Sequence, residues 1–240
     1  MKTIDITEIL AKEPIVKGKS KHLFHYDDNH YIARLIPSLS SFTYNRYEMV
    51  EKTDALRLDF YEMAVQRLNN QGIKTAFVER VDEVTYLTRK CSNPPFEVIV
   101  KNFAVGSTLR KYPGLFPENA PFNPPIVKFD YRIDPEDQPI AEDYLRAYGE
   151  DPDALKRIAL QTNEILLGWL SPSVLVDFCL IFGKNAEGDI CITSEISPDC
   201  MRLKSQTGES LDKDLFRQGK SHEEIIAIWT QLIQHMKAHS

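Results

Sequence analysis

The first half of the chain alternates short apolar runs with turns, a pattern typical of antiparallel strands. Runs at residues 21–26 and 31–35 flank a polar turn and predict a hairpin. Apolar side chains recur at helical spacing from Leu56 to Leu68, and Gly72 is placed to end that helix. Three more strands are expected, at residues 75–81, 84–90 and 96–103.

The second half is richer in helical patterns. The stretch 112–125 contains several prolines and little periodicity, so we expect a long loop or a connection between lobes. Asp151 is placed as the N-cap of a helix over residues 152–169. Strands at 174–182 and 189–193 are predicted to form a second hairpin.

A last helix begins after Ser221, which with Glu224 forms a capping box. The predicted fold is α+β, with an antiparallel N-terminal sheet lobe at residues 1–111 and a mixed, helix-rich C-terminal lobe at 112–240. Such a plan places a ligand cleft between the lobes.

Composition narrows the classes of function. The chain has 240 residues, a formal net charge of −6 and 42% hydrophobic residues. The acidic balance disfavours nucleic acid as a partner. The N-terminus has no signal-peptide pattern, and no apolar run is long enough to span a membrane, so we expect a cytoplasmic protein with no membrane partner. Its four cysteines have no Cys-x-x-Cys spacing and are expected to be reduced.

Residues 17–21, Lys-Gly-Lys-Ser-Lys, are the first candidate for anion binding. Alternating lysines would lie on one face of an extended strand, and Gly18 would let the backbone approach a ligand. A solvated basic strand is the alternative interpretation. The spacing is not that of a Walker A motif.

Two later segments also carry candidate chemistry. Ser107 follows Gly106 at a strand-to-helix junction, which suits anion binding or simple helix capping. Residues 194–202 combine carboxylates, a proline turn and an arginine, and residues 212–217 add mixed charge; solvated turns are the alternative. His235 and His239, four positions apart, are a weak candidate metal pair.

Taken in order, these segments resemble the SAICAR synthetase family over nearly the whole chain. The similarity rests on short motifs with shared order and spacing: Gly18-Lys19-Ser20-Lys21, Val105-Gly106-Ser107, Asn123-Pro124-Pro125, Val176-Asp177-Phe178 with Phe182-Gly183, Glu195-Ile196-Ser197-Pro198-Asp199 with Arg202, and Lys213-Asp214 with Phe216-Arg217. The resemblance implies a two-lobed fold and an enzyme that uses ATP and Mg²⁺ to join aspartate to a carboxylated aminoimidazole ribonucleotide.

The resemblance also implies roles for individual residues. Lys19 and Lys21 would bind ATP phosphates. The ribonucleotide would contact Lys101, Ser107, Asp199 and Arg202, with Lys101 standing where the family usually has arginine. The catalytic set would be Lys213, Arg217 and Asp177, the first two receiving the carboxylates of aspartate. Glu195 is the remaining candidate metal ligand. A homo-oligomer is expected.

Several family residues are replaced in this chain. Cys179 stands in place of a lysine, while Ile181 and Ser194 stand in place of acidic residues. Residues 40–45 and 137–139 also depart from the family pattern. Magnesium needs hard oxygen ligands, so these changes predict weak Mg²⁺-dependent ATP binding.

Three hypotheses follow. The chain is a working SAICAR synthetase-like ligase, or a relative that keeps the ribonucleotide pocket but performs a different reaction without ATP, or a protein that only binds ligand. In the second and third cases no cofactor is expected. Cys179 could fill space or act as a nucleophile.

Overall fold

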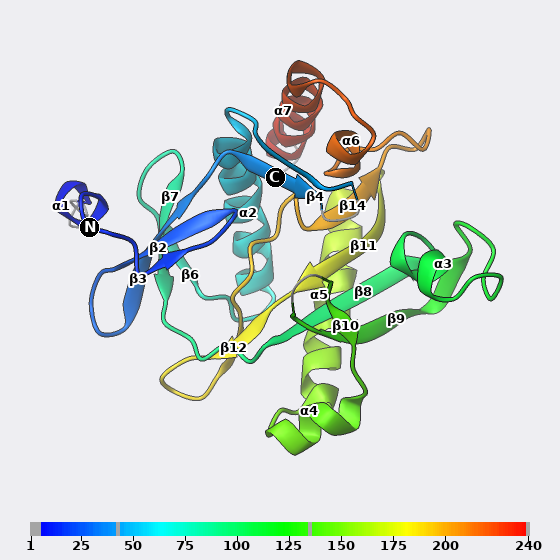
Figure 1. Ribbon diagram of the computed structural model, residues 1–240, viewed down its shortest axis with the longest axis horizontal. Coiled ribbons are helices and arrows are strands. Elements are labelled where there is room, and N and C mark those ends of the chain that lie inside the picture. Colours follow the sequence, from blue (N-terminus) through cyan, green and yellow to red (C-terminus); the bar gives the residue numbers. More distant parts are fainter. Residues whose placement is uncertain (1–5, 42–43, 134–135, 239–240) are drawn as a thin grey trace.

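The computed structural model describes residues 6–41, 44–133 and 136–238. It is a mixed α+β structure in which all strand pairs of the two larger sheets are antiparallel (Figure 1). The first sheet has five strands, in the order β1 (Val16–Lys17), β2 (Lys21–His25), β3 (His30–Leu35), β7 (Thr85–Arg89) and β6 (Phe77–Arg80).

The second sheet also has five strands and carries the residues of the candidate site. Its order is β10 (Gln138–Pro139), β9 (Pro121–Tyr131), β8 (Phe96–Phe103), β11 (Val174–Leu180) and β14 (Met201–Lys204). Two small hairpins complete the strands: β4 (Ser38–Ser41) with β5 (Arg46–Met49), and β12 (Phe182–Lys184) with β13 (Ile190–Ile192). The helices are α1 (Thr7–Leu10), α2 (Thr53–Asn70), α3 (Ser107–Lys111), α4 (Glu142–Tyr148), α5 (Pro152–Leu170), α6 (Asp214–Arg217) and α7 (His222–Ala238).

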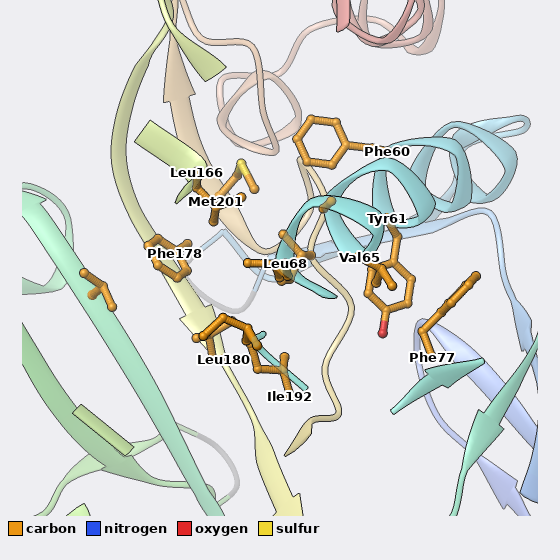
Figure 2. Close-up of a cluster of buried hydrophobic side chains, with 14 of the residues drawn as sticks. Phe60, Tyr61, Val65, Leu68, Phe77, Leu166, Phe178, Leu180, Ile192 and Met201 are labelled. Atoms are coloured by element: carbon orange, nitrogen blue, oxygen red, sulfur yellow. The ribbon is translucent and has the colours of Figure 1, made fainter. Parts of the chain in front are cut away.

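Helix α2 joins the two sheets into one hydrophobic core. Its buried side chains include neighbouring positions such as Phe60 with Tyr61 and Ala64 with Val65, so they cover a broad face of the helix that reaches both sheets. Figure 2 shows Tyr61 and Val65 on the side of Phe77 from the first sheet, while Leu68 extends toward Phe178 of the second. Because both sheets pack on the same core, they cannot separate without exposing it.

Helix α5 covers one face of the second sheet, packing against β8, β9 and β11. It begins where predicted: the Asp151 side chain accepts hydrogen bonds from the backbone N–H groups of Asp153 and Ala154, and Pro152 occupies the first helical position. The face that α5 covers holds one buried polar pair, since Asn102 of β8 donates to Asn163 of α5 at 2.9 Å. Because side chains alternate along a strand, Lys101 of β8 lies on the opposite, polar face, where it contacts Asp177 of β11.

A smaller cluster fixes α6 beside that polar face. Leu215 and Phe216 of α6 pack with Leu39 and with Trp229 of α7. The predicted capping box begins α7, since the Ser221 N–H donates to Glu224 Oε2 at 2.9 Å and the Glu224 N–H donates to Ser221 Oγ at 3.2 Å.

Two local predictions in the second half of the chain are wrong. The expected loop at 112–125 ends earlier, because β9 begins at Pro121; this part of β9 pairs only with β8, so its prolines need not donate to a second neighbour. The expected strand 174–182 divides at Ile181, whose carbonyl accepts the N–H of Thr193. As a result, β11 belongs to the large sheet and only β12 forms the hairpin with β13.

The lysines at the N-terminus do not share one strand. Lys17 ends β1 and Lys21 begins β2, and the Gly18 N–H donates to the Lys21 carbonyl at 3.0 Å across the turn between them. Lys19 is therefore exposed at the tip of a tight hairpin.

In the second sheet β8 pairs with β9 and β11, which both follow it in the chain. Strand β8 itself lies before the expected lobe boundary between residues 111 and 112, and that boundary stays a prediction. Of the positions singled out in the sequence, residues 42–43 and His239 lie outside the described residues. In the described part of the chain, no helix has the length and apolarity needed to cross a membrane.

Candidate functional site

An ion-pair network lies on the polar face of the second sheet. The register of β8 and β11 places Lys101 opposite Asp177, and Lys101 Nζ lies 2.9 Å from Asp177 Oδ2. On the other side, β14 places Arg202 opposite the same aspartate, with Arg202 Nη1 at 2.8 Å from Asp177 Oδ2. Lys101 and Asp177 are buried. Asp177 therefore holds two cations in fixed positions.

The position of Arg202 is set by two further contacts. Its Nε lies 3.1 Å from Asp214 Oδ2, which begins α6. Gly106 has φ +56°, and a Cβ at this position would lie 2.8 Å from Arg202 Nη2. Only glycine adopts this backbone conformation at low cost while leaving room for the guanidinium. Gly106 thus leaves space for the Arg202 side chain.

Ser107 is the first residue of α3, and no side chain caps that helix. The capping role considered for Ser107 is therefore wrong. Gly106 occupies the N-cap position, and the Ser107 side chain instead lines a pocket.

Two more cations, Lys213 directly before α6 and Arg217 at its end, complete the ion-pair network. Lys213 Nζ lies 2.9 Å from Asp199 Oδ1, and Arg217 Nη1 lies 2.6 Å from Asp214 Oδ1. Burial would raise the pKa of the Asp199 carboxyl, but the charges of Lys213 and Arg57 bring it below its ordinary value. Asp199 is therefore an anion at neutral pH.

These elements enclose a pocket of about 240 Å³. Seven of the residues singled out in the sequence line it: Lys101, Ser107, Asp177, Asp199, Arg202, Lys213 and Arg217. Four of the seven are cationic and two are anionic, so these side chains leave an excess of two positive charges. The pocket is suited to an anion, and the guanidinium and ammonium donors suit phosphate or carboxylate oxygens.

The remaining lining residues include Cys179 and Cys200. Burial raises the pKa of the Cys179 thiol well above its ordinary value, and the nearby Glu97 carboxylate adds to this effect. A protonated, buried thiol is a poor nucleophile. The raised pKa therefore favours the space-filling interpretation of Cys179.

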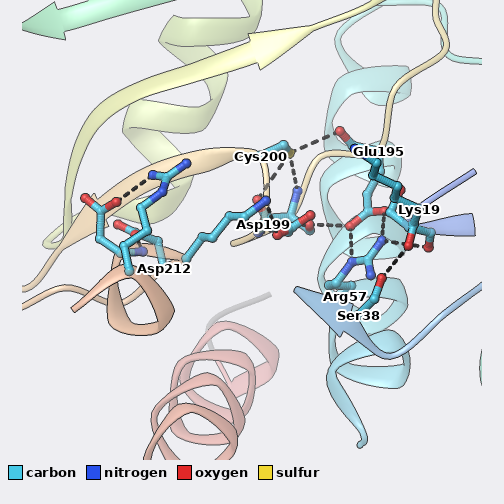
Figure 3. Close-up of polar contacts among 12 residues, drawn as sticks. Lys19, Ser38, Arg57, Glu195, Asp199, Cys200 and Asp212 are labelled. Atoms are coloured by element: carbon cyan, nitrogen blue, oxygen red, sulfur yellow. Dashed lines mark hydrogen bonds and ion pairs between the residues drawn. The ribbon is translucent and has the colours of Figure 1, made fainter. Parts of the chain in front are cut away.

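Glu195 lies outside this pocket in a buried ion pair. Its two oxygens each accept a hydrogen bond from Arg57, from Nε and Nη2, both at 2.7 Å, and Ser197 donates to Oε1 (Figure 3). Arg57 is fully buried and also donates to the carbonyls of Ile36 and Ser20, at 3.0 and 3.3 Å. Burial would raise the pKa of the Glu195 carboxyl, but the Arg57 charge and hydrogen bonds lower it below its ordinary value.

The residues around Glu195 do not fit a magnesium site. Ile181 offers no oxygen in its side chain, and Ser194 Oγ accepts the Ile181 N–H at 3.0 Å. Both Glu195 oxygens are occupied by Arg57. Within residues 6–41, 44–133 and 136–238, no three His, Cys, Asp or Glu side chains gather in a way that could hold a metal ion. Magnesium prefers carboxylate oxygens, and here the Glu195 carboxylate already neutralises a buried guanidinium.

Lys19 and Lys21 are not among the residues that line the pocket. The hairpin that carries them contacts the Arg57 region instead: Arg57 donates to Ser20, Ser38 Oγ donates to the Lys19 carbonyl (Figure 3), and Lys21 Nζ lies 3.3 Å from the Tyr86 hydroxyl. The structure thus brings seven of the expected residues together and places the two lysines apart from them.

Comparison with known proteins agrees with the sequence motifs. The family model for SAICAR synthetase matches residues 14–231. The chain belongs to the SAICAR synthetase family. It is 33% identical over 223 residues to the phosphoribosylaminoimidazole-succinocarboxamide synthase of Methanocaldococcus jannaschii, covering 90% of this chain and 91% of that protein. The enzyme of the same name from Methanobrevibacter smithii is 36% identical over 221 residues, covering 88% of this chain and 90% of that protein.

Solved structures of the SAICAR synthetase family share the fold. A type-2 SAICAR synthetase in complex with ADP superposes with a TM-score of 0.87 and 30% identity, covering 93% of this chain and 97% of that chain. The Ehrlichia chaffeensis phosphoribosylaminoimidazole-succinocarboxamide synthase gives a TM-score of 0.87 at 26% identity, covering 94% and 99%. The predicted family and α+β fold class are confirmed, and the homologues are carbon–nitrogen ligases.

Proposed function

We propose that this SAICAR synthetase family member is an ATP-dependent ligase that joins a carboxyaminoimidazole ribonucleotide to aspartate. The observation that carries the proposal is the pocket described above. Four cations from β8, β14 and the α6 region meet around a space of about 240 Å³. A ribonucleotide supplies a phosphate and a ring carboxylate, and aspartate supplies two more carboxylates, so both substrates are anions.

In this proposal the anion-binding residues divide between the two substrates. Arg202, Ser107 and Lys101 bind the ribonucleotide, because Asp177 and Gly106 hold the Arg202 fork in one orientation. Lys213 and Arg217 receive the carboxylates of aspartate. These roles use the strong, charge-assisted hydrogen bonds that guanidinium and ammonium groups form with oxyanions.

The reaction is a two-step condensation. A carboxylate oxygen of the ribonucleotide attacks the terminal phosphorus of ATP, whose bond to ADP breaks, and an acyl phosphate results. The amine of aspartate then attacks the acyl carbon, phosphate leaves, and the amine loses a proton as the amide forms. Lys19 and Lys21 are proposed to bind ATP phosphates from the hairpin beside Arg57. No step is assigned to a metal ion, because the residues around Glu195 do not fit one.

The poor fit of the residues around Glu195 to a magnesium ion favours a second function. With Ile181, Ser194 and the occupied Glu195, the protein could keep the ribonucleotide pocket and perform a different reaction, or only bind its ligand, without ATP. A cytoplasmic location and a homo-oligomeric state stay predictions under either proposal.

An endpoint assay separates the two functions. The protein is incubated with the carboxyaminoimidazole ribonucleotide, aspartate, ATP and Mg²⁺, and the mixture is analysed by mass spectrometry for the succinocarboxamide product and by colorimetry for phosphate. The ligase proposal predicts equal amounts of product and phosphate, both dependent on ATP. Ribonucleotide binding without any ATP-dependent product would favour the second function and overturn the first.

A further inference from the structure

Cys91 and Cys191 lie one hundred positions apart in the sequence and meet away from the ligand pocket. Cys91 follows β7, whereas Cys191 is the middle residue of β13. Cys91 also lines a separate cavity of about 440 Å³, together with Arg89, Lys90 and Lys184. Cys191 is buried, so a small solute reaches this pair from the side of Cys91.

A glycine lets the two thiols meet. Gly183 is paired directly with Cys191 across the β12–β13 hairpin. A Cβ on residue 183 would lie 2.9 Å from Cys91 Cβ, so Cys91 occupies the space that a side chain at 183 would fill. Directly paired residues place their Cβ atoms about 4.5–5.5 Å apart, so Cys91 and Cys191 lie side by side over Gly183.

The thiols also influence each other's ionisation. A hydrogen bond from Cys91 lowers the pKa of Cys191 to about 7, and the Arg89 charge acts in the same direction. The same hydrogen bond, together with burial, raises the pKa of Cys91. Both effects favour a thiolate on Cys191 with the proton on Cys91, and a thiolate is the form of cysteine that reacts with oxidants.

From this arrangement we propose that Cys91 and Cys191 form a redox-modification site that a small peroxide closes to an intramolecular disulfide. Cys91 Sγ attacks a peroxide oxygen as its proton passes to the Cys191 thiolate. The O–O bond breaks, and a sulfenic acid and hydroxide form. Cys191 Sγ then attacks Cys91 Sγ, the S–O bond breaks, and water forms. Hydrogen peroxide takes up the two electrons that the sulfur atoms lose.

The other two cysteines provide an internal comparison. Burial raises the pKa of Cys200 to about 12, and Cys179 is shifted in the same direction. Cys200 is also held by its own turn, since its Sγ lies 3.2 Å from the carbonyls of Glu195 and Ser197. Both thiols are protonated and should react far more slowly with peroxide than the Cys91–Cys191 pair.

The disulfide would strengthen a junction that the native fold already makes. Ser92 exchanges two backbone hydrogen bonds with Lys184, at 2.8 and 3.0 Å, and Asn93 donates to Thr193. These contacts attach the segment after β7 to the β12–β13 hairpin. A cross-link between residues so far apart in the chain restricts the unfolded state, so closing it should raise Tm by about 5–15 °C.

The test treats the reduced wild-type protein with hydrogen peroxide and maps its cysteines. Intact mass should fall by two hydrogen atoms, peptide mapping should join Cys91 to Cys191, and a thiol reductant should reverse both the mass change and the rise in Tm. Cys91→Ser and Cys191→Ser should each abolish the mass loss, whereas Cys179→Ser should behave like the wild type.

Several results would overturn the proposal. These are a wild-type protein that only gains oxygen, a cross-link that includes Cys179 or Cys200, and a Cys91→Ser variant that still loses two hydrogens. Because the mapping is done on the wild-type chain, it remains decisive even where a serine variant folds poorly. None of these readouts depends on ligase activity, so failure here leaves the proposed function untouched.

Discussion

Replacing Glu195 with alanine should destabilise the protein strongly, because it leaves the Arg57 guanidinium buried without its counter-ion. Arg57 is fully buried, and Glu195 accepts two of its hydrogen bonds at 2.7 Å. Removing one partner of such a pair costs about 3–5 kcal/mol of unfolding free energy. For a chain of this size that corresponds to a fall in Tm of about 6–20 °C.

A surface pair supplies the matched control. Lys74 and Asp189 approach to 2.6 Å, but their side chains are 56% and 40% exposed. Asp189→Ala should therefore cost no more than about 1 kcal/mol. The double change Arg57→Leu with Glu195→Leu should recover part of the loss, because it removes both buried charges together.

Denaturant titration monitored by circular dichroism measures all of these variants, and calorimetry with MgATP measures metal-dependent binding. The reasoning would be refuted if Glu195→Ala unfolded like Asp189→Ala and at the same time lost Mg²⁺-dependent ATP affinity. That result would make Glu195 a metal ligand, as the family resemblance implies, and not the partner that neutralises Arg57.

Two further predictions concern the ligand pocket and its surroundings. Gly106→Ala should weaken ribonucleotide binding at least tenfold, because the added Cβ displaces Arg202. Gly188→Ala is the control: this residue has φ +83° but open space around the added Cβ, so the change should cost a similar stability of about 1–2 kcal/mol and leave binding unchanged. Equal affinities of the two variants in calorimetry would disprove the steric argument. Burial and the Asp214 charge raise the pKa of Asp212 to about 7. The folded protein therefore binds a proton at Asp212 more tightly than the unfolded chain does. This contribution to stability is complete below about pH 4 and is lost as pH rises through 7. Relative to the wild type, Asp212→Asn should therefore become more stable between pH 4 and 7 in denaturant titrations, and a pH-independent difference would contradict the assignment.

Local patterns predicted most of the fold because they reflect local physics. The helix α5 began at its Asp151 cap, and the box at Ser221 began α7, since both signals depend on groups within one turn. The division of the strand at Ile181 could not be predicted in this way. It depends on the Thr193 N–H, which arrives from twelve residues later.

The site was partly predictable for a different reason. The family resemblance named seven lining residues, but Asp214 was quoted in a motif without a role, and Arg57 was missed. Arg57 had a signal: it lies on the same helical face as Phe60, Ala64 and Leu68, so a charge there must be buried and paired. Which carboxylate pairs with it depends on how α2 packs against the segment after β13, and one sequence does not contain that information.

The most direct test of the ligand pocket is calorimetric titration of the carboxyaminoimidazole ribonucleotide into wild type, Arg202→Ala and Arg146→Ala. Arg146 is an exposed arginine on α4, so its replacement matches the change in net charge. The account predicts one-site binding to the wild type and to Arg146→Ala, and a loss of about 1.5–3 kcal/mol, roughly 10–150-fold in Kd, for Arg202→Ala. Equal affinity in all three proteins, or no binding to the wild type, would contradict it.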